Sequence, residues 1–426
     1  MKYIYKLGSK LHLSLGFCSI VLAFALAGCG TGAKTMHDNV SAKPFGDRYV
    51  VVLSLDGFRY DYWKKAQTPT LDSLARHSTY GRLRPCFPSL TFPNHYAMAT
   101  GLHPDHHGIV ANEFWDPEHG HYRLGDRKAV ENPAFYNGEP AWNTARRQGV
   151  NTASFFWVGS ETPINGHHPH RWKKFNDKVP YMNRADSVIS WLQLPEKERP
   201  HLIMWYIEEP DHTGHEQTPE SPVTLAMVSH LDSILGAFLY KMNQLPIASK
   251  IDFLLVSDHG MATYTPDKSV NLADYVDRDQ FDHVATGAFT HLYPKKDMAQ
   301  DLYNKLQKVP HVRVFWKKDV PTYLHYGTNA RIGDIVVIPN IGTMVYFAKN
   351  PNFKTGGAHG YDNKAPEMNA IFMANGPHFR SDSELSQPLL NLNVYGIICK
   401  LLNITPAPND GDVSEVNKLI VPAHQK

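Results

Sequence analysis

Short runs of almost wholly apolar residues recur along the chain and predict the strands of a buried sheet. The first run, Tyr49 to Leu55, is rich in β-branched residues, as suits a strand covered on both faces. Similar runs stand at 152–158, 201–207, 251–256 and 370–374. Strands of this kind are typical of parallel sheets, because helices cover both faces of such sheets.

Helical spacing appears between these runs. The clearest example is about 222–240, where apolar residues return every three or four positions: Leu225, Val228, Leu231, Leu235 and Phe238. The alternation of strands and helices predicts an α/β fold with a central, mostly parallel sheet flanked by helices. The stretch 265–355 is less regular, with a short strand candidate at 334–339. We expect it to be a smaller inserted subdomain within a catalytic domain of residues 47–426.

The start of the chain has a different pattern. Three lysines precede an apolar run from Leu11 to Ala27, which ends in the sequence Leu26-Ala27-Gly28-Cys29. This is the layout of a secretory signal, and its ending resembles the bacterial lipoprotein box. We therefore expect residues 1–28 to be removed, Cys29 to be lipidated on a membrane facing the periplasm, and residues 29–46 to form a flexible tether. The alternative is an uncleaved membrane anchor.

Charge and cysteine content narrow the possible functions. A formal net charge of +2 gives no strong field for nucleic acid, so no nucleic-acid-binding surface is expected, and nothing implies a protein partner. Beyond Cys29 only Cys86 and Cys399 remain, and their pairing cannot be assigned from sequence. The chain has no CxxC-type motif, so His and carboxylate side chains must supply any metal site.

Acidic residues and histidines follow three of the predicted strands. In chain order they are Asp56, then Asp211 with His215, then Asp258 with His259. Ligands of open α/β sheets bind at the carboxyl ends of the strands, so these side chains are expected at one edge. His359 lies in a fourth segment, 356–361, whose glycines permit tight turns and close backbone approach.

Each of these residues has an ordinary alternative role. A single Asp after a strand is usually a helix cap or a turn residue, and a single His beside Gly is usually part of a loop. Three carboxylates and three imidazoles at one sheet edge are different, because buried charges without partners are costly. Mixed His and Asp ligands suit zinc, and six of them suit two ions that each keep an open position.

A hydroxyl nucleophile is expected in the segment 88–96. Thr91 stands just before Pro93, which is tolerated in a first helical turn, and an Ala/Met run follows. Capping the helix explains Thr91 as well as catalysis does, and Ser89 is a rival hydroxyl. The residues alone leave this choice open.

Five ordered segments resemble those of the nucleotide pyrophosphatase/phosphodiesterase family, which belongs to the alkaline phosphatase superfamily. They are SLDGF at 54–58, PSLTFPNHY at 88–96, EEPDHTGH at 208–215, SDHGM at 257–261 and GGAHGY at 356–361. GLHPDHHGIVANEFWDP at 101–117 also fits, and the resemblance covers about residues 49–403.

The resemblance implies a role for each candidate site residue. It divides the six ligands between two Zn²⁺ ions, Asp211, His215 and His359 holding one and Asp56, Asp258 and His259 the other. It favours Thr91 over Ser89 as the nucleophile, in contact with the metals. It places Asn112 where the family has a donor to a phosphoryl oxygen.

Three aromatic residues match the family's substrate-binding positions. Phe92 stands beside the nucleophile, and Trp157 and Phe175 match a slot that stacks a base. For Trp157 and Phe175 the alternative is core packing. The family often has Tyr near position 175, so the base preference stays open.

The resemblance implies hydrolysis of phosphodiester and pyrophosphate bonds in nucleotides and their derivatives, with release of nucleoside 5'-monophosphates through a phosphothreonine intermediate on Thr91. A phosphodiesterase for lysophospholipid or glycerophosphocholine headgroups would use the same metal site. A phosphomonoesterase would need cationic groups that the matched segments lack. A non-catalytic zinc-binding lipoprotein would be expected to lack a ligand or the nucleophile, and all seven are present.

Overall fold

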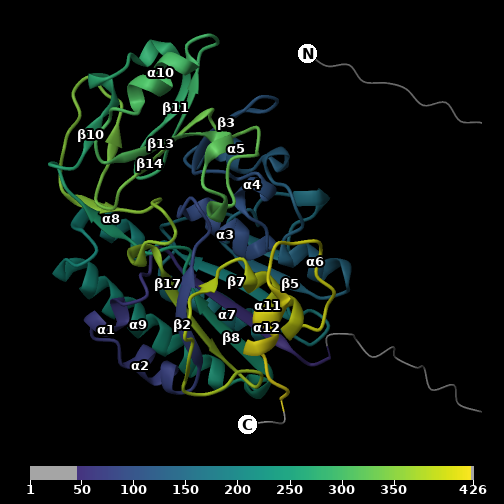
Figure 1. Cartoon of the computed structure of the whole chain (residues 1–426). Helices are drawn as coiled ribbons and strands as arrows, with labels where there is room; N and C mark the ends of the chain where they lie inside the picture. Colours follow the sequence, from purple (N-terminus) through teal and green to yellow (C-terminus); the bar gives the residue numbers. More distant parts are fainter. Residues whose placement is uncertain (1–45, 424–426) are drawn as a thin grey trace, which may run out of the picture. The chain divides into compact units, whose positions relative to one another are not determined.

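The computed structural model describes residues 46–423, so the predicted signal segment and lipidated Cys29 lie outside the described residues. A nine-stranded sheet forms the centre of this part of the chain (Figure 1). Five adjacent strands are parallel, in the order β8 (Ile251–Val256), β1 (Tyr49–Leu55), β7 (Leu202–Ile207), β5 (Thr152–Phe155) and β6 (Arg171–Lys173).

The other side of β8 holds the remaining strands. β17 (Ala370–Asn375) is antiparallel to both of its neighbours, β8 and β2 (Thr79–Arg84). Two short strands pair parallel with β2, namely β18 (Ser383–Glu384) and β19 (Leu389–Leu390). The five predicted apolar runs all form strands of this sheet, and only β17 runs against the common direction.

Helices cover both faces of the sheet. On one face lie α2 (Pro69–Arg76), α7 (Tyr181–Leu192) and α9 (Pro222–Asn243), and on the other lie α3 (Thr91–Thr100), α6 (Ala141–Arg147) and α11 (Asn393–Leu401). The side chains of β1 show why two helical layers are needed. Val50 and Val52 pack into one hydrophobic core, whereas Val51 and Leu53 pack into the other. The predicted α/β fold with a mostly parallel sheet is confirmed.

Helix α9 is the predicted helix at 222–240. Among the described residues it is the one helix long and apolar enough to cross a membrane, with 22 residues and a mean hydropathy of 1.4. Its residues Val228, Leu231, Leu235 and Phe238 are buried in the core against the sheet. Those residues keep the spacing expected from the sequence, so α9 serves as a core helix of the fold.

The irregular stretch 265–355 contains a second sheet. Four antiparallel strands lie in the order β11 (Phe281–Ala285), β12 (Thr290–Pro294), β14 (Ile335–Pro339) and β13 (Val312–Trp316), with α10 (Ala299–Leu306) beside them. A hydrophobic cluster of its own includes Leu292, Leu302 and Val337. The strand expected at 334–339 is β14, and the limits of the inserted subdomain stay a prediction.

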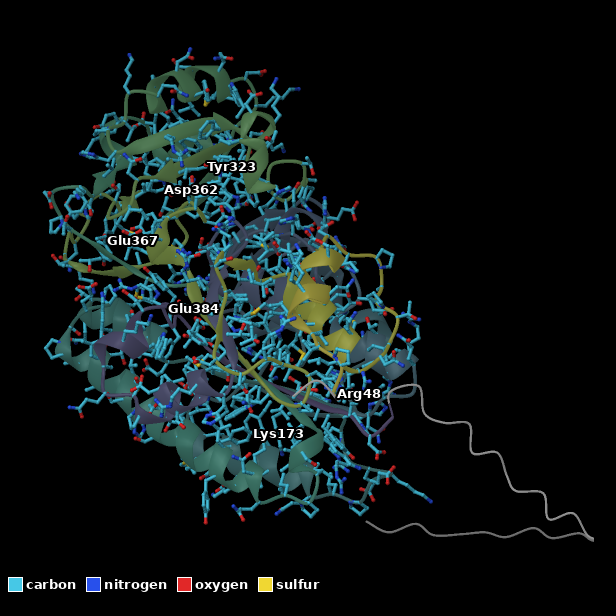
Figure 2. The ribbon with its side chains drawn as sticks, turned by 60° about the horizontal axis from the view of Figure 1, so that its bottom comes forward. Arg48, Lys173, Tyr323, Asp362, Glu367 and Glu384 are labelled. Atoms are coloured by element: carbon cyan, nitrogen blue, oxygen red, sulfur yellow. The ribbon has the colours of Figure 1, made fainter. Side chains whose placement is uncertain are left out.

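Two contacts join the second sheet to the segment that carries His359. Tyr323 donates a hydrogen bond to Asp362 Oδ2 over 2.6 Å, and Arg313 donates to the same oxygen over 2.8 Å. Figure 2 shows Tyr323 and Asp362 side by side. Because Asp362 lies three residues after His359, these bonds hold the loop of that histidine in place.

The two cysteines of the described chain are both free and buried. Cys86 donates from its thiol to Asn391 Oδ1, and Cys399 lies in the core beside α3 and α6. No disulfide links them in this structure.

Candidate active site

Three aspartates lie at the carboxyl ends of three adjacent parallel strands. Strand β1 runs between β8 and β7, and Asp56 follows it directly. Asp258 follows β8 by two residues. Asp211 begins helix α8 (Asp211–Gln217), four residues after β7. The sheet edge therefore brings together carboxylates that are far apart in the sequence, as the strand pattern predicts.

Asp211, His215 and His359 form the first candidate metal group. Asp211 and His215 are four residues apart on α8 and so share one face of the helix. His215 Nε2 lies 3.3 Å from Asp211 Oδ2, and His359 Nε2 lies 3.4 Å from Asp211 Oδ1. The two imidazole Nε2 atoms are 3.0 Å apart.

Asp56, Asp258 and His259 form the second group. His259 Nε2 lies 3.0 Å from Asp258 Oδ2 and 3.5 Å from Asp56 Oδ1. The rings of His259 and His359 stack with their centroids 3.5 Å apart, so the two groups are immediate neighbours. Together the groups contain all six residues expected as ligands.

Each of the three histidines has its Nδ1 atom against a backbone carbonyl. The acceptors are Gly357 for His215, Ser89 for His359 and Gly260 for His259, at 2.8, 2.9 and 2.9 Å. A carbonyl only accepts, so each Nδ1 carries a proton and Nε2 is the atom of each ring that is left to bind a metal. This tautomer is the one that metal-binding histidines adopt when a neighbouring group orients the ring.

Buried carboxylate oxygens without partners indicate that cations belong here. Asp56 Oδ1, Asp211 Oδ1 and Asp258 Oδ2 are buried and have no hydrogen-bond partner. Burial, followed by the charges of Asp258 and Asp211, raises the pKa of Asp56 well above its ordinary value. Burial, followed by the neighbouring His259, lowers the pKa of His359 to about 3. Bare carboxylate oxygens and imidazole Nε2 atoms are the donor set that a divalent metal requires.

Two glycines allow the loops of the site to approach each other. Gly57 has a φ of +62°, and a Cβ atom there would lie 2.8 Å from the Cβ of Asp211. At Gly357 a Cβ atom would lie 2.3 Å from the carbonyl oxygen of Gly214. Larger residues at these positions would push apart the strand ends that carry the candidate ligands.

Thr91 is the first residue of helix α3 and lines a pocket together with Asp56 and the three residues of the first metal group. Its Oγ1 atom lies 3.2 Å from His259 Nε2. The Ser89 hydroxyl is fully buried and donates to the carbonyl of Tyr361 over 3.0 Å. The hydroxyl that faces the pocket is therefore that of Thr91.

Asn112 lies beside Thr91 with its side chain in a fixed orientation. Its Oδ1 atom accepts a hydrogen bond from the backbone N–H of Phe92 over 3.0 Å. The amide nitrogen is consequently the end of the side chain that is available to the pocket, which Asn112 also lines. An N–H donor thus stands next to the hydroxyl of Thr91.

A pocket of about 340 Å³ extends from the metal groups between aromatic side chains. Phe92, Phe156, Phe175 and Tyr206 supply its aromatic lining. Phe175 is 37% exposed, and its ring contacts those of Phe156 and Tyr206 at centroid distances of 5.3 and 6.3 Å. The structure therefore brings Phe92 and Phe175 to the pocket, as expected.

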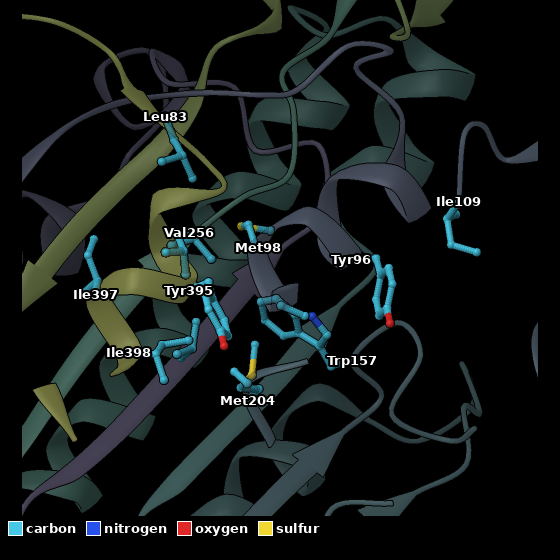
Figure 3. Packing of buried hydrophobic residues seen from close by; sticks show 14 of the residues in the cluster. Leu83, Tyr96, Met98, Ile109, Trp157, Met204, Val256, Tyr395, Ile397 and Ile398 are labelled. Carbon is cyan, nitrogen blue, oxygen red and sulfur yellow. The ribbon is translucent and has the colours of Figure 1, made fainter. Parts of the chain in front are cut away.

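The prediction for Trp157 is wrong. Trp157 is 1% exposed, lies in the core with Met204 and Tyr96, and does not line the pocket (Figure 3). Its indole N–H donates to the carbonyl of His95 over 3.1 Å. Strand β5 ends at Phe155, and the left-handed backbone at Phe156, with a φ of 70°, interrupts the alternation, so Phe156 takes the place in the pocket.

Four further residues of the site were not predicted from the sequence, although His95 stands within the segment 88–96. Tyr206 donates from its hydroxyl to Asp56 Oδ2 over 2.5 Å, and His95 Nδ1 lies 3.3 Å from Asp258 Oδ2. Arg127 and Glu161 line the pocket and form an ion pair of 2.5 Å. A tyrosine at the catalytic end of a buried strand is a signal that could have identified Tyr206. Arg127 begins the short helix α5 (Arg127–Val130) and Glu161 lies in a turn after β5, and neither position has such a signal.

Known proteins resemble this chain over most of its length. The family described as type I phosphodiesterase / nucleotide pyrophosphatase matches residues 50–362. The venom phosphodiesterase of Macrovipera lebetinus is 33% identical over 386 residues, which cover 87% of this chain and 45% of that protein. Human ectonucleotide pyrophosphatase/phosphodiesterase family member 1 is 34% identical over 399 residues, covering 88% and 43%.

Solved structures extend the comparison to the fold. Murine ectonucleotide pyrophosphatase / phosphodiesterase 5 matches with a TM-score of 0.84 and 30% identity, covering 88% of this chain and 100% of that one. An inactive variant of the murine protein in complex with AMP matches with the same TM-score and 29% identity.

The fold and site define an α/β protein with two candidate metal groups beside a helix-terminal threonine. The chain belongs to the type I phosphodiesterase / nucleotide pyrophosphatase family. It spans less than half the length of the curated relatives described above.

Proposed function

We propose that this chain hydrolyses phosphodiester and diphosphate bonds in nucleotides and nucleotide derivatives and releases nucleoside 5'-monophosphates. The observation that carries the proposal is the convergence of three bare carboxylate oxygens and three Nε2 atoms beside the Thr91 hydroxyl. This arrangement opens into an aromatic pocket suited to a base. The names of the relatives, and the AMP bound to the murine neighbour, support the same activity.

The two side-chain groups would hold two Zn²⁺ ions. Asp211, His215 and His359 would bind one ion, and Asp56, Asp258 and His259 would bind the other together with Thr91. Mixed imidazole and carboxylate donors suit zinc better than magnesium or calcium. Bound there, zinc would lower the pKa of a hydroxyl and stabilise negative charge on phosphoryl oxygens.

Thr91 acts as the nucleophile in this proposal. Its Oγ1 atom attacks phosphorus after losing its proton, and the bond to the leaving oxygen breaks on the opposite side. A phosphothreonine diester results, and water then cleaves the bond to Thr91. The Ser89 hydroxyl is unsuited to this role because it is buried against Tyr361.

Asn112 stabilises the charge that develops during attack. Because the Phe92 N–H holds Oδ1, the amide nitrogen is free to donate to a phosphoryl oxygen. Tyr206 and His95 act as positioning residues. The Tyr206 hydroxyl donates to Asp56 Oδ2, and His95 Nδ1 lies beside Asp258 Oδ2. Phe92 and Phe175 supply apolar ring faces for the base.

The stereochemical course tests the covalent step. Two successive in-line displacements each invert phosphorus, so a diester made chiral at phosphorus is expected to give product with net retention. Net inversion would mean that water attacks directly and that Thr91 is not a nucleophile.

Substrate comparison tests the pocket. The metal-loaded protein is expected to hydrolyse the p-nitrophenyl ester of thymidine 5'-monophosphate and to release thymidine 5'-monophosphate. The alternative, a phosphodiesterase for lipid headgroups, predicts faster hydrolysis of glycerophosphocholine or p-nitrophenyl phosphocholine. A higher kcat/KM on the choline esters would replace the nucleotide assignment and leave the metal site intact.

We also propose that the protein is exported and attached to a bacterial membrane through lipidated Cys29. The sequence around Leu26–Cys29 supports this, and these residues lie outside the described part of the chain. Metabolic labelling with a fatty acid should label the native chain and not a Cys29→Ser variant; equal labelling of both would contradict the anchor.

A further inference from the structure

A second pocket, of about 410 Å³, opens beside the first. Four residues line both pockets, namely Asn112, Leu124, His215 and His359. The two pockets therefore meet at the candidate metal groups. The phosphorus of a diester bound at those groups carries two ester substituents, here called arms. The structure offers a separate pocket for each arm.

The placement of Thr91 decides which arm leaves into the second pocket. Thr91 lines only the first pocket and contacts His259 of the second metal group. His215 and His359, from the other metal group, line the second pocket as well as the first. Attacking and leaving oxygens lie on opposite sides of phosphorus, so the leaving arm departs away from Thr91. The aromatic first pocket keeps the nucleoside 5'-phosphate.

The second pocket lies where the β3–β4 hairpin (Glu113–Asp116 and Gly120–Arg123) meets the second sheet. The hairpin is fixed there by two contacts. The backbone N–H of Trp115 donates to the Tyr293 hydroxyl over 3.0 Å, and the Trp115 ring stacks on that of His283 with the centroids 3.9 Å apart. The pocket wall is therefore an ordered surface of the fold rather than a loose loop.

Most side chains of the second pocket are apolar, and its charged groups oppose each other. Leu90, Ala111, Ala288, Phe289 and Met344 form much of the wall. Beyond the candidate metal ligands, the charged lining residues are Glu113 and Arg123, which face each other across the hairpin. Glu113 also pairs with His121 at 2.9 Å. The positive charge of Lys354 acts to lower the pKa of His215, but Lys354 does not line the second pocket.

We propose that this second pocket binds the leaving arm of the substrate and selects an uncharged one, such as a nucleoside. A pyrophosphate leaving arm would place several negative charges against apolar walls and Glu113, with Arg123 as the one opposing cation of the lining. The preferred substrates are then diesters that join two nucleosides, rather than nucleoside triphosphates. This inference rests on the proposed function.

The reaction balances as a hydrolysis of a dinucleoside monophosphate. Thr91 Oγ1 forms a bond to phosphorus while the bond from phosphorus to the 3' oxygen of the leaving nucleoside breaks. That oxygen takes a proton and the nucleoside departs through the second pocket. Water then cleaves the threonine–phosphate bond, which releases a nucleoside 5'-monophosphate and restores the Thr91 hydroxyl.

Adenylyl-(3',5')-adenosine and ATP test the inference, because both deliver AMP and differ only in the leaving arm. The zinc-loaded protein is expected to show a kcat/KM at least about tenfold higher on the dinucleotide. Glu113→Lys reverses one charge in the lining and should shift this ratio about tenfold or more toward ATP. Glu118→Lys makes the same change in the exposed turn of the same hairpin, outside both pockets, and should leave the ratio as it is.

Equilibrium binding gives a second readout. In a Thr91→Ala background, where turnover is blocked, calorimetry should show tighter binding of the dinucleotide than of ATP, and Glu113→Lys should narrow that difference. Equal or higher kcat/KM on ATP, or a ratio that Glu113→Lys leaves unchanged, would overturn the inference while the proposed function stands. Failure to hydrolyse either substrate would instead overturn the proposed function.

Discussion

At the residue scale, the site depends on atoms that are held in place by the backbone. Three histidines donate from Nδ1 to carbonyls of Gly357, Ser89 and Gly260, and each carboxylate keeps one oxygen bare. The Thr91 hydroxyl lies against this set, 3.2 Å from His259 Nε2. The orientation of each group is thus set before any substrate or metal binds.

Thr91→Ala should reduce turnover of a nucleotide diester by about a thousandfold or more, because the attacking oxygen is removed. Bound zinc, measured by atomic absorption, should change little, since the six Asp and His ligands remain. Ser89→Ala is the matched control and should cost less than about tenfold, because the backbone carbonyl that orients His359 is retained. The opposite ranking of the two variants would move the nucleophile to Ser89.

Phe175→Ala should raise KM about five- to a hundredfold, which corresponds to the loss of roughly 1–3 kcal/mol of stacking on a base. The free energy of unfolding should change little, since the ring is 37% exposed. Trp157→Ala should instead lower the free energy of unfolding by about 3–5 kcal/mol, because a buried side chain is deleted. Trp157→Phe tests the distinction. A rise in KM as large as that of Phe175→Ala would mean that Trp157 does contribute to binding the base.

Two pairs of similar residues, Thr91 with Ser89 and Trp157 with Phe156, show what the sequence pattern alone leaves undetermined. Five of the six ligands were predictable because they follow apolar strands, whereas His359 follows the glycine-rich segment at 356–358. Thr91 and Ser89 are both hydroxyls at the start of one helix, and only the packing of Ser89 against Tyr361 distinguishes them. Trp157 and Phe156 are neighbouring aromatics, and the left-handed backbone at Phe156 decides which of them faces the pocket.

At the element scale, the metal groups depend on how closely the strand ends approach. Asp56 follows β1 directly and Asp211 begins helix α8 after β7, and the Asp211 backbone N–H donates to the Asp56 carbonyl over 3.1 Å. Gly57 lies at this junction with no space for a side chain. The spacing of ligands from two strands is therefore set by one backbone contact.

Gly57→Ala should lower the affinity for zinc at both groups, because the new methyl group would collide with Asp211 and the backbone has a positive φ. The conformation alone costs about 1–2 kcal/mol for a residue other than Gly. Equilibrium zinc binding with a competing chelator gives the measurement. Gly46→Ala has a positive φ but open space around the added Cβ, and should bind zinc like the native chain. Equal affinities for both variants would mean that the junction does not control the site.

The elements were predictable to different degrees. Five apolar runs and the helix at 222–240 correspond to β1, β5, β7, β8, β17 and α9, because buried strands and an amphipathic helix leave clear periodic patterns. Strand β2 and the hairpin β3–β4 were not predicted. Strand β2 has the sequence TYGRLR, with partly exposed polar positions, and the hairpin is short and packs on distant residues such as His283 and Tyr293.

At the scale of the whole molecule, metal binding and stability should be coupled. Three carboxylates, each with one buried oxygen that has no hydrogen-bond partner, lie at the catalytic edge, and burial followed by the charges of Asp258 and Asp211 raises the pKa of Asp56. Removing metal with a chelator should lower Tm by several degrees, because the native state loses the ligand that stabilises it. Restoring zinc should restore Tm.

Asp56→Asn provides the control for this effect. The amide keeps an acceptor for the Tyr206 hydroxyl and removes the carboxylate whose pKa is raised by burial and by the charges of Asp258 and Asp211. The metal-free variant should therefore be more stable than the metal-free native chain, while its Tm should respond less to zinc. If the native chain has the same Tm before and after metal removal, the fold tolerates these carboxylates without cations.

The most direct test of the account is a zinc titration of the metal-free protein, with bound zinc and hydrolysis of the p-nitrophenyl ester of thymidine 5'-monophosphate followed in the same sample. The account predicts no turnover without metal, a rate that rises with bound zinc, and a plateau at about two ions per chain, as a two-metal phosphoryl-transfer site requires. Full turnover by the metal-free protein, or a rate that does not follow zinc binding, would contradict it.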